Sequence, residues 1–162
     1  MLFRSRSSTR IPAGAVVVSD PVALAVAPLS DLAISVFVPG DTGAGTSPLT
    51  MHAGANQTNY VSGPGNHVAD LDLPGATPLP SWYFLSRVEV AAPRDVGAVV
   101  AFGDSITDGA RTSPDTNSRW PDVLARRLAQ AGIKAGVLNL GIAGNRVFLD
   151  RKSTRLNSSH SQ

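Results

Sequence analysis

The chain has 162 residues, of which 43% are hydrophobic and 16% charged, and it contains no cysteine. This composition is sufficient for a packed core and too poor in charge for a disordered chain. The lack of cysteine excludes disulfides and thiolate metal sites, although it does not fix a cellular compartment. No apolar run approaches the roughly 20 residues that a membrane-spanning helix needs. We therefore expect one globular domain of ordinary size, or parts of two.

Basic residues gather at the two ends of the chain, which has an isoelectric point of about 9.5. Three arginines lie within the first ten residues, and three further basic residues lie between positions 151 and 155. A nucleic-acid-binding surface would combine a basic face with interleaved aromatic residues, and no such stretch lies between the ends. The sequence therefore predicts no nucleic-acid partner and no membrane span.

Both ends resemble translated sequencing adapters. Residues 150–160 have no periodicity and match one reading frame of a common short-read adapter, and residues 2–5 match the end of the opposite adapter. We therefore expect residues 1–10 to be an adapter-derived or disordered leader and residues 150–162 an adapter-derived tail, and we exclude both from the reasoning on fold. Residues 6–149 carry ten basic and eleven acidic side chains, so the basic character belongs to the ends. Residues 6–149 are expected to be an internal piece of a longer protein.

Residues 11–92 are predicted to form β-structure. Large apolar residues alternate with small or polar ones over 32–38 and again over 82–90, as in strands with one buried face. Weaker strand patterns occur at 16–18, 48–51 and 59–61. Turn residues separate these segments about every ten positions, which is typical of a sandwich or jelly roll. The range 11–92 is therefore expected to be a partial β-sandwich or jelly-roll-like domain.

The pattern changes beyond a junction at residues 91–94. Residues 97–102 form a continuous apolar run, as in a parallel strand that is buried on both faces, and 136–140 form a second apolar strand. Between them, residues 119–131 place apolar side chains on one helical face. Strand, helix and strand predict one right-handed βαβ unit within 93–149, so the fold class is α/β.

Turn and capping residues mark the ends of the predicted helix. Asn117 or Ser118 can cap its start, and Pro121 lies in its first turn. Gly132 supplies the stop, because glycine readily adopts the left-handed conformation that ends many helices.

Each predicted strand of this unit ends in a loop that is rich in glycine and polar residues. The first loop reads Gly103-Asp104-Ser105-Ile-Thr-Asp-Gly, and the second runs from Asn139 to Asn145. Ligands of such folds bind at the carboxyl ends of the strands. A serine there can aim its hydroxyl and its N–H into the crevice, and Gly144 has no Cβ to block a second N–H. These groups predict a nucleophile and two oxyanion donors.

The first loop resembles the first sequence block of the SGNH (GDSL-type) hydrolases, and the second loop resembles their second block. A β-rich segment followed by this domain is similar to bacterial members related to lysophospholipase and carbohydrate esterases. The resemblance implies a truncated flavodoxin-like domain that hydrolyses carboxylic esters, such as acetylated carbohydrates or lipids, without a metal or organic cofactor. It implies Ser105 as nucleophile and oxyanion donor and Gly144 as second donor, with Asp104, Asn139 and Asn145 in support.

Two parts of the family pattern have no counterpart. The sequence contains no Gly-x-Asn-Asp, whose Asn is the third oxyanion donor, and no Asp-x-x-His, whose His deprotonates the serine. His52 and His67 precede the serine and are expected to be ordinary loop or strand-edge residues, while His160 lies in the excluded tail. We therefore expect the chain to be a catalytically incomplete fragment.

The serine loop admits other interpretations. Asp, Ser, Thr and Gly also favour turns for conformational reasons alone. Neither the Gly-x-Ser-x-Gly elbow nor a dinucleotide-binding Gly-x-Gly-x-x-Gly is present. Asp104 and Asp108 could suggest a metal pair, but without a nearby histidine a turn-stabilising role is favoured.

A binding function is the alternative from another class. Tyr60, Trp82 and Tyr83 could stack on sugars, which would make residues 11–92 a carbohydrate-binding module. The aromatic core of a small sandwich is the favoured interpretation of these residues.

Overall fold

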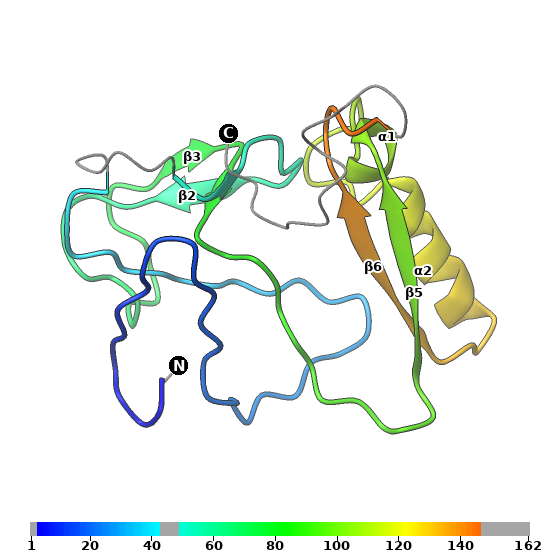
Figure 1. The fold of residues 1–162 in the computed structure, drawn as a ribbon, viewed down its shortest axis with the longest axis horizontal. Coiled ribbons are helices and arrows are strands. Elements are labelled where there is room, and N and C mark those ends of the chain that lie inside the picture. Colours follow the sequence, from blue (N-terminus) through cyan, green and yellow to red (C-terminus); the bar gives the residue numbers. More distant parts are fainter. Residues whose placement is uncertain (1–2, 43–48, 147–162) are drawn as a thin grey trace.

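The computed structural model describes residues 3–42 and 49–146, and its two regions differ in regularity (Figure 1). The N-terminal segment, residues 3–42 and 49–96, is mostly irregular. Strand β1 (Met51–His52) pairs with β4 (Trp82–Tyr83), and β2 (Asn59–Val61) pairs with β3 (Thr77–Leu79), both antiparallel. Each pair is a separate two-stranded sheet.

The strand predictions for this segment are only partly correct. The strand at 59–61 is confirmed as β2, but the predicted strands at 16–18 and 32–38 are wrong, and the one at 82–90 shortens to β4. Of the range 48–51, residue 48 lies outside the described residues and Met51 belongs to β1. An alternating pattern forms a strand only under two conditions: another segment must pair with it, and one of its faces must be buried.

The segment 32–38 meets neither condition, because no described residue pairs with it in a ladder and Val36 is 57% exposed. The β-sandwich predicted for residues 11–92 is therefore not confirmed.

The C-terminal region is the predicted βαβ unit. Strands β5 (Gly97–Gly103) and β6 (Ala135–Gly141) run parallel, in a register that begins with Gly97 opposite Ala135 and ends with Gly103 opposite Gly141. Helix α1 (Ser105–Asp108) follows β5 directly, and helix α2 (Trp120–Gln130) packs against β6 (Figure 1). The mixture of parallel strands and helices is consistent with the predicted α/β class.

The ends of α2 follow the sequence signals in part. The prediction that Asn117 or Ser118 caps the start is wrong: the N-cap is Arg119, whose N–H donates to the Asp122 carboxylate at 3.0 Å. This is the backward-reaching half of a capping box, and it leaves the upstream side chains free for other contacts. The predicted stop at Gly132 is confirmed: α2 ends at Gln130, Ala131 is its C-cap, and Gly132 follows with a left-handed φ of 69°.

The N–H groups of the two residues after the C-cap satisfy carbonyls of the last turn. The Gly132 N–H donates to the Ala129 carbonyl, and the Ile133 N–H donates to the Leu128 carbonyl. This is the Schellman arrangement, which depends on a left-handed residue at the position that Gly132 occupies.

One face of the two-stranded sheet remains open. Ala101 is only 3% exposed, whereas Phe102, which points to the opposite face, is 55% exposed. Val100, Leu138 and Leu140 share the face of Phe102 and are also about half exposed. The prediction that the first strand is buried on both faces is therefore wrong for this face. No helix in the described part of the chain has the length and apolarity to cross a bilayer.

Candidate active site

The serine turn lies where β5 passes into α1. Asp104 is the N-cap, and its carboxylate accepts a hydrogen bond from the Ile106 N–H at 2.9 Å. Ser105 is the first residue of the helix and is partly exposed. Gly109 closes the turn with a φ of 117°, and its N–H donates to the Ser105 carbonyl. Glycine adopts this left-handed conformation without the steric cost of a Cβ, which explains the glycine at this position.

The second loop lies beside the first. The Ile142 N–H donates to the Gly103 carbonyl at 3.0 Å, and the Asn145 side-chain amide reaches the same oxygen at 3.5 Å. Gly144 has a φ of 82°, and a Cβ at this position would meet no atom within 4 Å. Glycine is thus needed here for its backbone conformation, while the space in front of it is open.

Asn139 fastens the second loop to α1. Its side-chain nitrogen donates to the Thr107 carbonyl at 2.8 Å, and its side-chain oxygen accepts from the Gly141 N–H at 2.9 Å. A Cβ on Gly141 would collide with the backbone of Thr107 and Asp108, so α1 rests directly on the end of β6. The ends of β5 and β6, at Gly103 and Gly141, and the Asn139 side chain therefore hold the serine turn in its orientation.

The N-terminal segment reaches this turn through a histidine. His52 Nε2 donates to Asp108 Oδ1 at 2.8 Å, and the two side chains are 14% and 13% exposed. The His52 ring also lies against Trp82, with ring centroids 4.7 Å apart. The expectation that His52 is an ordinary strand-edge residue is therefore incomplete: it lies on strand β1, but it contacts the helix that carries Ser105.

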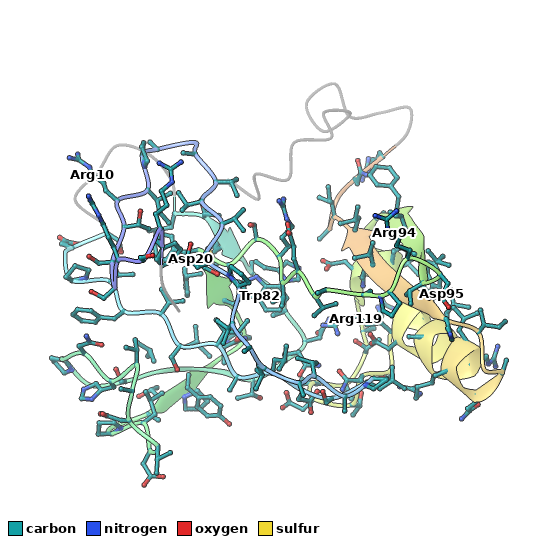
Figure 2. The ribbon with its side chains drawn as sticks, turned by 90° about the horizontal axis from the view of Figure 1, so that it is seen from below. Arg10, Asp20, Trp82, Arg94, Asp95 and Arg119 are labelled. Atoms are coloured by element: carbon teal, nitrogen blue, oxygen red, sulfur yellow. The ribbon has the colours of Figure 1, made fainter. Side chains whose placement is uncertain are left out.

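Arg119 joins the same two regions. Its Nε donates to the Asp108 carbonyl at 2.9 Å, and its Nη2 donates to the carbonyl of Ala55, which is fully buried. Asn56 adds a hydrogen bond from its side-chain nitrogen to the Gly109 carbonyl at 2.9 Å. Figure 2 shows Trp82 within the irregular segment and Arg119 beside helix α2.

Two more side-chain pairs extend this contact. Asp115 accepts hydrogen bonds from both the N–H and the hydroxyl of Thr58, and Gln57 donates to Asn117. The hydroxyl and N–H of Thr58 hold the pKa of the Asp115 carboxyl below its ordinary value of 3.8. We call this set of contacts, between residues 52–58 and residues 108–119, the seam.

The aspartates of the serine turn have structural partners. Asp104 caps α1 and Asp108 bonds with His52, and the described residues contain no cluster of three or more side chains of the kinds that bind metals. The favoured turn-stabilising role fits these contacts, and residues for a metal site are not gathered here. His67 lies elsewhere, in a loop where it pairs with Asp70 at 2.8 Å.

The aromatic residues of the binding alternative do not form one platform. Trp82 lies against His52, and the exposed Tyr60 lies on a different two-stranded sheet. Tyr83 is 6.4 Å from Phe84. No observation in the described structure favours a shared sugar-stacking surface.

Nothing in the sequence indicates the seam. His52 and Asp108 are 56 positions apart, and no motif links them. The sequence pattern indicates Arg119 only as the start of a helix. The positive φ angles of Asn56, Asp115 and Asn117 mark the seam as irregular backbone, a property that residue types alone do not specify.

One comparison with known proteins bears on this site. Residues 101–161 match the model of the GDSL-like Lipase/Acylhydrolase family, a range that includes the last three residues of β5, the serine turn, α2 and β6. The match supports the SGNH/GDSL assignment and a hydrolase of the GDSL type. No curated protein matches the chain.

Proposed function

We propose that Ser105 is the nucleophile of a carboxylic ester hydrolase. The observation that carries the proposal is the position of Ser105 on the strand-to-helix turn, beside the second glycine loop. The Ser105 hydroxyl would lose its proton to water, and its oxygen would bond to the acyl carbon. The ester C–O bond would break and the alcohol would leave after taking up a proton. Water would then cleave the acyl–serine bond, releasing the acid and restoring the hydroxyl. The N–H groups of Ser105 and Gly144 are the proposed oxyanion donors, since no hydrogen bond among the described residues occupies either.

The proposed substrates are acetylated carbohydrates or lipids, a class that rests on the family resemblance. Asp104, Asn139 and Asn145 would hold the two loops in place around the reacting carbonyl. The mechanism requires only side-chain and backbone groups.

Phosphonylation of the full chain by a fluorophosphonate, read by intact mass, tests the nucleophile. Oxyanion donors favour attack by about 10²-fold, so Ser105 should react well ahead of other exposed serines. Ser105→Ala should abolish the fast adduct, while Ser113→Ala, a matched change on an exposed loop, should preserve it. An unchanged adduct in Ser105→Ala would refute the assignment.

We further propose that the chain turns over very slowly, because its sequence has no Asp-x-x-His to supply the base. Without a base the reactive species is the small alkoxide fraction, so phosphonylation should accelerate with pH without reaching a plateau. Hydrolysis of p-nitrophenyl acetate should stay near the rate of Ser105→Ala. A wild-type rate well above that of Ser105→Ala would show that a base is present.

A further inference from the structure

We propose that the N-terminal segment positions the serine turn through the seam, and that His52 is the positioning residue, acting through Asp108. The active site would then be a composite of both regions. The link to catalysis rests on the proposed role of Ser105, whereas the mechanical link from His52 to the turn can be tested without it.

The first step is that His52 is itself held rigidly. It lies opposite Trp82 in the β1–β4 ladder, and its ring is tilted against the Trp82 ring at 47°. A side chain fixed by both a ladder and an aromatic neighbour loses little further freedom when it bonds to Asp108. The hydrogen bond is largely shielded from water, which increases its strength.

The second step is that Asp108 is mechanically connected to Ser105. Both belong to α1, which has four residues and is far too short to be stable alone. The Asp108 N–H donates to the Asp104 carbonyl at 3.0 Å, so the residue that accepts from His52 also closes the single helical turn around Ser105. Displacement of Asp108 would therefore change the direction in which the Ser105 hydroxyl points.

The third step is that the seam adds hydrogen-bond donors at the end of this helix. The last carbonyls of a helix have no partner within the helix. The Asp108 carbonyl accepts from Arg119. The Gly109 carbonyl accepts from Asn56, in addition to the N–H and the hydroxyl of Thr112. Three side chains, those of His52, Asn56 and Arg119, thus hydrogen-bond to the same end of α1. His52 and Asn56 come from the N-terminal segment.

Amide hydrogen exchange of the full chain, followed by mass spectrometry on a peptide covering 103–110, tests the inference. His52→Ala should raise the exchange rate of this peptide about tenfold, the effect of losing one hydrogen bond to a charged group. His52→Gln should restore the wild-type rate, because its amide nitrogen can donate to Asp108. His67→Ala is the matched control, since it removes an equally short histidine–aspartate bond elsewhere, and it should leave the peptide unchanged.

Unchanged exchange in His52→Ala, or failure of His52→Gln to restore it, would overturn the inference. If His52→Ala does not fold, Asn56→Ala can be used instead. It removes only the hydrogen bond to the Gly109 carbonyl and should raise exchange of the same peptide several-fold. No change in that variant would count equally against the seam as a positioning device.

Phosphonylation of Ser105 gives the catalytic readout. His52→Ala should slow it about tenfold and His52→Gln should restore it, because misplaced nucleophiles react more slowly. A wild-type Ser105 that is not labelled would refute the proposed function alone, and the exchange data would still decide the role of His52.

Discussion

The two regions of this chain differ in how their backbones find hydrogen-bond partners. β5 and β6 form a seven-residue parallel ladder, whereas the ladders of the N-terminal segment contain two and three residue pairs. Both regions contain apolar patterns typical of strands. Such a pattern therefore becomes a strand only where a second segment of matching length lies beside it.

The irregular region nevertheless shapes the site. Its residues 52–58 contact the end of α1 and the loop that leads to α2, and Ala55 in this stretch is fully buried. The regular unit carries the serine, and the irregular segment contributes contacts that hold it. Variants at the seam therefore test how far the two regions depend on each other.

The largest effect is expected from Arg119→Ala, which removes the side chain that donates to a carbonyl of each region. The side chain is 10% exposed and donates to one carbonyl from each region, besides lying 3.7 Å from the Asp122 carboxylate. Its loss should lower the free energy of unfolding by about 3 kcal/mol, since bonds to a charged donor are lost in a shielded place. Urea unfolding measures this change.

Arg127→Ala is the control for this experiment, because it alters the same residue type on the exposed side of the same helix. It should change stability by no more than about 0.5 kcal/mol. Equal losses in the two variants would mean that the two regions are energetically independent.

A smaller effect is expected from Gly141→Ala, which tests the packing of α1 on β6 within the regular unit. The new Cβ would collide with the backbone of α1, and we expect a loss of about 2 kcal/mol as the serine turn shifts. Gly136→Ala changes the same strand where a Cβ meets nothing within 4 Å, so it should be neutral or slightly stabilising. Thermal unfolding of the pair measures the difference, and similar midpoints would contradict the close packing of α1 on β6.

Sequence patterns predicted the regular unit well because its signals are local. The apolar runs, Pro121 and Gly132 each act within a few residues, and the helix bounds agree to within one residue at each end. The N-terminal segment was predicted poorly because strand formation depends on distant partners. The alternation at 32–38 carries no information about whether a partner exists.

The same distinction applies to the site. The loops after β5 and β6 were predicted to meet because the ends of parallel strands share one edge of a sheet. The seam could not be predicted, because it joins side chains from separate parts of the chain through irregular backbone. His52 and His67 look alike in the sequence, and only the structure separates the residue that contacts α1 from the residue that pairs within its own loop.

A third, smaller effect concerns the seam at low pH. Because the pKa of Asp115 is lowered in the folded chain, mainly by the Thr58 hydroxyl, its contribution to stability is present above pH 3.8. It should be lost as the pH falls below that value, through the folded-state pKa. Thr58→Val should move the Asp115 pKa back toward 3.8, measured by NMR titration of its carboxyl carbon. A lowered pKa that persists unchanged in the variant would rule out the hydroxyl as the main cause.

The smallest effect should come from His67, whose interactions are confined to the irregular region. The hydrogen bond to the Asp70 carboxylate is the largest cause that raises the pKa of His67 above 6.5, and the hydrogen bond to the Pro64 carbonyl is the second. The stabilisation from this protonated pair is full below pH 6.5 and should disappear as the pH rises through the folded-state pKa. Asp70→Asn should lower the His67 pKa toward 6.5 in an NMR titration without altering exchange at residues 103–110. If exchange at the serine turn followed His67 protonation, the loop around His67 would be coupled to the site, and the contrast between the two histidines would be lost.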